Sequence, residues 1–262
     1  MIRIISYTLF LLISYIGKAQ VSENRAVENF SKIKVATGVN VFYTVSATKS
    51  IEVATDDNEK LQLIKTVFEN NLLSIYVDTK NYKKEKNKNV IQKNSINGVE
   101  FKNITITISG PNLEAITASS SATIKFTNSN KTENLNLEAS TSGDINGDFE
   151  ANKINIHVSS SSDIKGNLQT KDLAIKASSS GDVELTGKAE NTTIDASSSA
   201  DCLLRNLYTK QATVKASSSA DVAILVTKSI EAKASSSANI VFYGNPSEII
   251  KEESSSGSVR GK

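Results

Sequence analysis

The stretch Leu173-Ala-Ile-Lys-Ala-Ser-Ser-Ser-Gly-Asp-Val183 decides the fold, because its pattern returns along the chain at nearly constant spacing. It joins a run of alternating apolar residues to a serine triplet, a small residue and an aspartate. The residue before each triplet or close variant stands at positions 118, 139, 158, 177, 196, 216, 234 and 253, so successive steps are 21, 19, 19, 19, 20, 18 and 19 residues. A fixed period near twenty residues with strand-like alternation is typical of a solenoid whose coils stack on one another.

Alternation before each serine block indicates which side chains face the interior. Leu173, Ile175 and Ala177 stand at every second position, as in a strand with one buried face. We therefore predict an all-β fold, a parallel β-helix (β-solenoid) with coils of about 19–20 residues, over residues 111–262. The tail from Pro246 loses the alternation, and we expect it to cap the last coil, because an open solenoid end exposes strand edges.

The chain has one cysteine and one histidine, and the repeat suggests a role for each. Cys202 excludes an internal disulfide and falls at the position that other coils fill with aliphatic residues, so we expect it in the core. The aliphatic counterparts are Ile124, Ile145, Ile164, Val183, Val222, Ile240 and Val259. His157 falls at an outward position, and no catalytic partner stands at a telling spacing.

The serine block itself allows two structural interpretations. If the alternation continues through it, Ser179 faces inward while Ser178 and Ser180 face outward, and the middle serines of successive coils form a buried hydroxyl ladder. The members of that ladder would be serines 120, 160, 179, 198, 218, 236 and 255, with Thr141. If the block is instead a turn, the same serines hydrogen bond to backbone groups.

An aspartate follows most serine blocks and forms a file of like charges. Its members are Asp144, Asp163, Asp182, Asp201 and Asp221, followed by Asn239 and Ser258. Carboxylates stacked about 5 Å apart repel by roughly 1 kcal/mol for each neighbouring pair in water. Turn geometry is the favoured explanation, because Gly-Asp and Ala-Asp favour bends. Calcium shared between coils is the alternative, with Asp163, Asp182, Asp201 and Asp221 as candidate ligands.

The first residues favour export. Residues 1–19 combine Arg3 with a short apolar run and small residues at 17 and 19, which predicts a cleaved signal peptide, with a membrane anchor as the alternative. No second hydrophobic segment follows, so we expect no transmembrane segment in the mature chain. The expected location is the periplasm, the outer-membrane surface or the extracellular space.

Residues 20–110 alternate like strands but lack the serine repeat. Leu61, Ile64, Val67 and Phe68 stand three to four residues apart, which predicts one short amphipathic helix near 57–70. A Lys-rich stretch at 78–98 predicts a solvated loop, with anionic surface polymers or lipid headgroups as possible contacts. Its lysines are Lys80, Lys83, Lys84, Lys86, Lys88 and Lys93. The turn at 110–112 marks the predicted boundary with the solenoid.

These features together resemble the putative auto-transporter adhesin, head GIN domain family of exported bacterial proteins. The resemblance rests on Phe30-Ser-Lys-Ile-Lys-Val35, Leu73-Ser-Ile-Tyr-Val77, Ile104-Thr-Ile-Thr-Ile108, the repeated Ser-Gly-Asp or Ser-Ala-Asp blocks and Tyr243-Gly-Asn-Pro246. It covers nearly all of the expected mature chain. The resemblance implies a β-solenoid and an adhesin-like role, and it supplies no catalytic residue.

The net charge of +2 from 30 basic and 28 acidic side chains argues against a nucleic-acid partner. We therefore favour an exported, non-enzymatic, adhesin-like solenoid, with no catalytic or cofactor-binding residue, that binds an extended polymer or protein at the cell envelope or surface, such as a surface polysaccharide or an envelope protein. The candidate contacts are the outward serines Ser178, Ser180, Ser197, Ser199, Ser217 and Ser219. The alternatives are a carbohydrate-active enzyme that uses neighbouring aspartates, which the absence of tryptophan disfavours, and an ice- or crystal-binding hydroxyl array.

Overall fold

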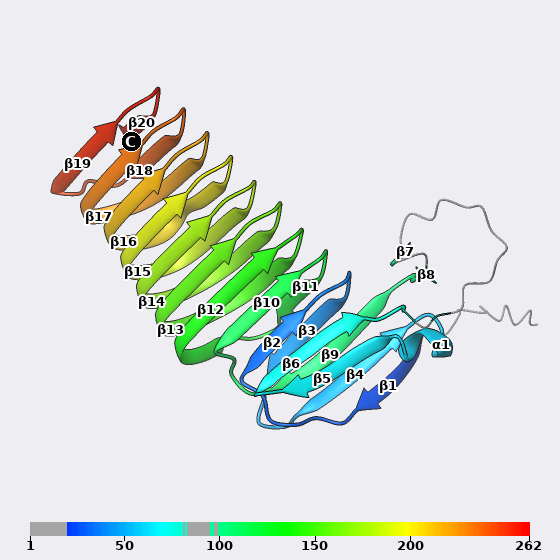
Figure 1. The fold of residues 1–262 in the computed structure, drawn as a ribbon. Coiled ribbons are helices and arrows are strands. Elements are labelled where there is room, and N and C mark those ends of the chain that lie inside the picture. The colour runs from blue at the N-terminus through cyan, green and yellow to red at the C-terminus, as the bar shows by residue number, and fades with distance from the viewer. Residues whose placement is uncertain (1–19, 81, 83–94, 97–98) are drawn as a thin grey trace, which may run out of the picture.

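The computed structural model describes residues 20–80, 82, 95–96 and 99–262. The expected signal peptide at 1–19 and five of the six lysines of the 78–98 loop lie outside the described residues. The described chain forms coils stacked along one axis (Figure 1). Eighteen of its strands belong to one continuous sheet, and β7 (Ser95–Ile96) and β8 (Val99–Glu100) form a separate antiparallel pair.

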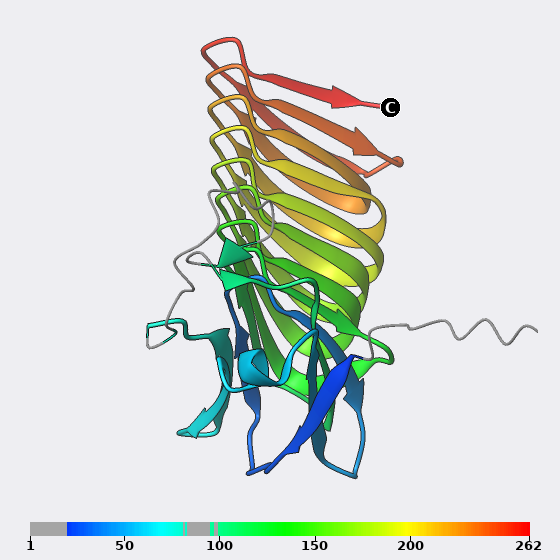
Figure 2. The same ribbon diagram turned by 90° about the vertical axis from the view of Figure 1, so that its right-hand side faces the viewer.

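Each coil consists of a first-face strand, a tight turn, a second-face strand and a broad bend (Figure 2). The first full coil of the serine repeat contains β10 (Ala115–Ser119) on the first face and β11 (Thr123–Phe126) on the second. Later strands run from the second face around the bend to the first face of the next coil. After β12 (Asn130–Ser140) these are β13 (Asp144–Val158), β14 (Asp163–Ala177), β15 (Asp182–Ala196), β16 (Asp201–Ala216) and β17 (Asp221–Ala234).

The coils pair in parallel and in register, which confirms the predicted solenoid. Equivalent residues of neighbouring coils are partners: Ile164 pairs with Val183, Val183 with Cys202, and Cys202 with Val222. Cys202 is fully buried, as expected from its aliphatic counterparts. The period of the sequence therefore becomes vertical files of side chains, with apolar files inside and polar files outside.

The serine blocks are tight turns, so the predicted turn is confirmed and the buried ladder is wrong. The expected hydrogen bonds from the central hydroxyls to backbone groups are not formed among the described residues. Their two central residues have positive φ, for example 52° at Ser198 and 58° at Ser199, as in a type I′ turn. Ala200 closes this turn by donating its amide hydrogen to the carbonyl of Ser197, with the two atoms 3.2 Å apart.

Two left-handed residues in succession break the period-two alternation of the strand. As a result Ser178 is half-buried, Ser179 and Ser180 are both exposed, and the inward pattern resumes at Gly181. The seven middle serines predicted inside are exposed, as is Thr141 in the remaining turn. Extrapolation of strand alternation failed here because the chain leaves the extended region for two residues.

The stack begins before the serine repeat, on the N-terminal side of the predicted boundary at 111. β2 (Lys32–Val35) and β3 (Asn40–Val45) pair in parallel with β10 and β11. β6 (Leu72–Val77) and β9 (Ile104–Gly110) pair in turn with β2 and β3. The antiparallel strands β1 (Val21–Arg25), β4 (Ser50–Thr55) and β5 (Ile64–Glu69) complete this end.

The predicted helix near 57–70 is present but much shorter. It begins where expected, with the Asp57 carboxylate accepting the amide hydrogen of Glu59 at 3.0 Å, and α1 (Asn58–Leu61) is one turn long. Residues 64–69 form β5 instead, so the predicted extent was wrong. Asn70 and Asn71 have φ of 51° and 62° and make the two-residue turn that pairs β5 with β6.

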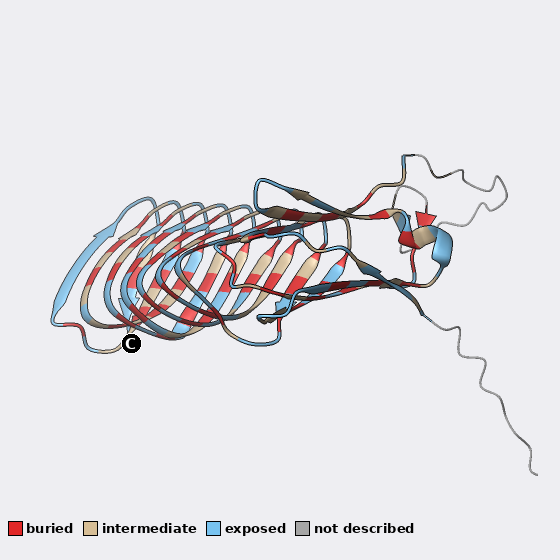
Figure 3. Cartoon of the chain, turned by 90° about the horizontal axis from the view of Figure 1, so that it is seen from below, coloured by how far each residue is buried: buried red, intermediate tan, exposed pale blue. Residues whose placement is uncertain are grey.

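The C-terminal tail continues the stack instead of folding over it, which corrects the expected cap. After β18 (Asn239–Tyr243), strands β19 (Glu248–Glu253) and β20 (Ser258–Gly261) form one more coil. Every residue of β19 is exposed, and the strand is pale blue in Figure 3. Lys251 and Glu253 occupy positions that are apolar in earlier coils, and Glu253 accepts the amide hydrogen of Val259 at 2.5 Å. Charged residues on this exposed strand disfavour edge-to-edge aggregation.

The buried thiol gives a direct test of the register. Burial raises the pKa of the Cys202 thiol to about 12. We expect no reaction of Cys202 with an aromatic disulfide reagent at pH 8 in the folded protein, and complete reaction in guanidinium chloride, because only the thiolate reacts. Rapid labelling in native buffer, followed by absorbance, would contradict the placement of this file in the core.

The turns give a test of stability. Replacing Ser198 by Asn and Ser199 by Gly provides residues that tolerate positive φ, and it should stabilise the protein by roughly 1 kcal/mol, or about 2–4 °C in Tm. The matched control, Ser198→Ala with Ser199→Ala, removes the same hydroxyls and keeps the backbone strain, so its Tm should stay near that of the natural protein. A lower Tm for the Asn-Gly variant would refute the assigned turn geometry.

Candidate functional site

The serine turns stack into a continuous ridge along one side of the solenoid, visible as the aligned tight turns in Figure 2. We call it the serine ridge and define it by the sixteen central turn residues with positive φ. They are residues 120–121, 141–142, 160–161, 179–180, 198–199, 218–219, 236–237 and 255–256, of which fifteen are serine and one is threonine. Neighbouring turns are about 4.8 Å apart, so the ridge is a straight array of hydroxyl groups.

Backbone hydrogen bonds hold the ridge in place and leave its side chains free. The amide of Ser199 donates to the carbonyl of Ser218 in the next turn at 3.0 Å, and the amide of Ser180 donates to Ser198 in the same way. Among the described residues, the hydroxyls of the serine ridge make no hydrogen bond within the protein. All sixteen residues are exposed. The ridge therefore offers donors and acceptors to a partner without first breaking internal bonds.

Serine is a costly residue for this turn. A non-glycine residue in the left-handed region costs on the order of 1 kcal/mol, whereas glycine and asparagine adopt it more readily. The chain uses asparagine for the same geometry at Asn70 and Asn71, and glycine at Gly38, yet the eight stacked turns use serine and one threonine. Backbone strain that persists across a surface is a reason to look for a function of the side chains that carry it.

The predicted contact serines fall into two groups in the structure. Ser180, Ser199 and Ser219 belong to the serine ridge and are exposed, whereas Ser178, Ser197 and Ser217 precede it and are half-buried. The exposed middle serines Ser179, Ser198 and Ser218 were missed because they were predicted inside. They are exposed because two consecutive residues have positive φ, and the alternation of apolar and polar residues does not reveal this backbone conformation.

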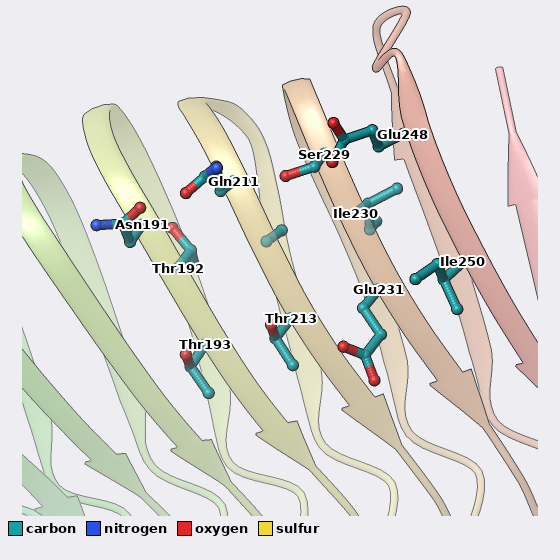
Figure 4. Close-up of a pocket in the computed structure, with 11 residues that line it drawn as sticks. Asn191, Thr192, Thr193, Gln211, Thr213, Ser229, Ile230, Glu231, Glu248 and Ile250 are labelled. Atoms are coloured by element: carbon teal, nitrogen blue, oxygen red, sulfur yellow. The ribbon is translucent and has the colours of Figure 1, made fainter.

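A second surface lies on the first face near the C-terminal end of the stack (Figure 4). It is a shallow trough of about 320 Å³ between two outward files of side chains. Asn191, Gln211, Ser229 and Glu248 form one file, and Thr193, Thr213, Glu231 and Ile250 form the other. These residues were not predicted as a site from the sequence, although the strand alternation predicts that they face outward. Their chemistry changes from coil to coil, unlike that of the serine ridge.

The aspartate file lies on the second face beside the serine ridge. Asp163 pairs with Asp182, Asp182 with Asp201, and Asp201 with Asp221. Burial, followed by repulsion from Asp182 and Asp221, raises the pKa of Asp201 above its ordinary value. Burial and repulsion from Asp163 raise the pKa of Asp144 in the same way. The repulsion expected from the sequence is therefore a feature of the folded chain.

Neighbouring polar groups offset part of this repulsion. Lys165 forms an ion pair with Asp163 at 3.4 Å, and the side-chain Nδ2 of Asn239 donates to the Asp221 carboxylate at 2.9 Å. Among the described residues, no group of three or more histidine, cysteine, aspartate or glutamate side chains is arranged to hold a metal ion. Calcium binding by Asp163, Asp182, Asp201 and Asp221 stays a prediction. His157 lies exposed in a mixed outward file between Glu138 and Lys176.

Replacing Asp201 by Asn tests the electrostatics of this file. The raised pKa means that the folded state disfavours the ionised carboxylate, so the natural protein gains stability as the pH falls through the folded pKa. We expect the variant to melt about 2 °C higher at pH 7 and low salt, with the difference disappearing below the ordinary aspartate pKa of about 4.

Salt and calcium provide the controls. The gain should shrink in 0.5 M salt, because partly exposed charges are screened. If calcium is the true counterion, adding it should raise the Tm of the natural protein and chelator should lower it, while Asp201→Asn should lose this response. An unchanged Tm with calcium and with chelator would refute calcium binding.

Solved structures of other proteins share the fold of this chain. A crystal structure from Parabacteroides distasonis, described as a putative lipid binding protein, has a TM-score of 0.82 and 18% identity, over 94% of this chain and 98% of that one. A putative adhesin from Parabacteroides merdae has a TM-score of 0.81 and 17% identity, over 94% and 97%. One from Bacteroides fragilis has a TM-score of 0.63 and 21% identity, over 94% and 98%. At these identities the likeness shows the fold alone.

A search of curated proteins finds no match. None of the helices among the described residues is long and apolar enough to cross a membrane. The sequence profile of one family matches residues 29–167 and 146–246, which together span most of the chain and every coil from β2 to β18. The chain therefore belongs to the putative auto-transporter adhesin, head GIN domain family.

Proposed function

We propose that this protein is an exported, non-enzymatic binding scaffold that holds an extended polymer at the cell envelope through its serine ridge. The observation that carries the proposal is the uninterrupted array of exposed hydroxyls without internal partners, kept on a strained backbone through eight turns. Adhesin-like family membership supports a surface partner and an exported location.

Binding would arise from many weak contacts. Each hydrogen bond contributes about 0.5–1.5 kcal/mol net, so no single serine is decisive. A partner with its own repeated hydroxyls or amides engages several turns at once, and its later contacts form at high effective concentration. A polysaccharide or an extended protein segment has this chemistry. The proposed contacts are the exposed serines of the serine ridge, with Ser178, Ser197 and Ser217 beside them.

The geometry favours a polymer over a lipid acyl chain. The solenoid interior is filled by aliphatic side chains such as Ile164, Val183 and Val222, which are buried. The trough on the first face is shallow and lined mainly by polar side chains. An acyl chain needs an apolar cavity, whereas a polysaccharide needs a long polar surface.

A six-residue alanine variant tests the proposal. Replacing Ser179, Ser180, Ser198, Ser199, Ser218 and Ser219 by Ala removes the hydroxyls of three successive turns and should lower affinity for a bound polysaccharide at least tenfold. Binding is measured on a polysaccharide panel by co-sedimentation and by biolayer interferometry. A thermal melt verifies that the variant stays folded.

The matched control changes the first face instead, with Thr193→Ala and Thr213→Ala in the trough. This variant should bind like the natural protein. Equal binding by all three proteins would contradict the serine ridge as the contact surface, and loss confined to the trough variant would move the site to the first face. Release of new chain ends from any polysaccharide would contradict the non-enzymatic assignment.

A further inference from the structure

The serine ridge ends in a pocket at its N-terminal end, where the regular turns stop. The pocket has a volume of about 470 Å³ and is lined on one side by Thr37 and by Ser120 and Ser121, the first turn of the serine ridge. The other side consists of Ser95 in β7 and of Lys102 and Asn103. Figures 1 and 2 show β7 and β8 beside the turn side of the first coils.

The wall opposite the serine ridge is held by a network of its own. The amide of Lys102 donates to the Asp56 carboxylate at 3.2 Å, and the buried Thr55 hydroxyl donates to the carbonyl of Asn103 at 2.9 Å. Lys60 forms an ion pair with Asp56 at 2.7 Å and lies over the ring of Phe101, 5.7 Å from its centroid. The hydrogen bonds from Lys60 and Lys102 lower the pKa of Asp56 against the effect of its burial.

The ridge wall is equally fixed. The amide of Gly38 donates to the carbonyl of Ser120 at 2.9 Å, which joins the Thr37 turn to the first serine turn. The pocket therefore stands between two walls whose backbones are hydrogen bonded without any ligand. Such preorganisation reduces the entropy that binding costs.

The lining indicates the chemistry of an occupant. Hydroxyls and amides predominate, with Asn40 and Asn103 as amides, and they match the hydroxyl groups of a sugar ring. Ile96 and the largely buried Phe101 add apolar surface against which ring carbons can pack. Lys102 is the single charged side chain among the described residues that line the pocket. One cation matches a carboxylate, whereas a doubly charged phosphate usually takes several donors or an arginine fork.

We propose that this pocket binds the terminal residue of an acidic polysaccharide, a uronic acid, whose following units lie along the serine ridge. The inference rests on the proposed function, because it places the chain end of the same polymer. β7 stands against the Thr37–Gly38 turn, one coil before the serine ridge, with Ile96 Cδ1 3.8 Å from where a side chain on Gly38 would begin. The polymer therefore ends at the pocket and extends toward the C-terminal coils.

The test compares an α-1,4-linked galacturonic acid tetramer with a neutral galactose tetramer and with inorganic phosphate, by calorimetry and by amide chemical shifts. The acidic tetramer should bind and should shift the amides of Lys102, Asn103 and Ser121. Lys102→Gln, which removes the charge but keeps a polar side chain, should weaken this binding at least tenfold and abolish the preference over the neutral tetramer. The control Lys125→Gln removes an exposed lysine of β11 that lies outside the pocket and should have no effect.

Ser95→Trp provides a second variant, since a bulky side chain at the rim should exclude the tetramer while a thermal melt verifies folding. Equal binding of acidic and neutral tetramers, equal losses in Lys102→Gln and Lys125→Gln, or phosphate binding as tight as that of the tetramer would overturn the pocket. Failure of the serine ridge as a binding surface gives a different result. If tetramer binding depends on Lys102 but the six alanine substitutions leave polymer binding unchanged, the pocket is supported and the ridge is refuted. The reverse pattern refutes only the pocket.

Discussion

In-register hydrogen bonding between coils is the constraint on which the rest of this structure depends. It includes the tight turns as well as the strands: the amide of Ser197 donates backward to Ala177 at 2.9 Å, and that of Ser199 donates forward to Ser218 at 3.0 Å. Because both directions are fixed, a coil cannot slip against its neighbour without losing bonds on both sides. Equivalent side chains of successive coils therefore stack in vertical files, and the same kind of side chain recurs about every 4.8 Å.

This constraint explains why the outer files contain unfavourable residues. A file of aspartates repels itself, and a file of left-handed serines is strained, yet both persist over several coils. The interior files, such as Ile164, Val183 and Val222, bury apolar surface in every coil. The stability gained by this burial offsets the small losses caused by the outward-facing residues. Stacking thus makes it possible to repeat a surface group that a single isolated turn would disfavour.

Much of this arrangement was predictable from sequence, and the failures have physical causes. The repeat period and the alternation of apolar residues placed Cys202 correctly in the core, because successive side chains of a strand point to opposite faces. The prediction that Ser179 faces inward was wrong, because two consecutive residues of positive φ interrupt the strand alternation. The spacing of Ile64 and Phe68 fits a helix or a strand, and only the Asn70-Asn71 turn decides between them. The trough at Thr193 and Thr213 depends on pairing across coils, which no single segment of sequence encodes.

Specific recognition requires a place where the repeat is interrupted. Along the serine ridge every turn offers the same hydroxyls, so a polymer could bind in many registers with similar energy. Between β6 and β9 a longer connection replaces the two-residue turn of the serine repeat, and its described residues include β7, β8, Lys102 and Asn103. Lys102 and Asn103 line the pocket together with the first serine turn. Regular coils therefore supply affinity through repetition, and the pocket beside the first serine turn is where a partner's register and direction can be set.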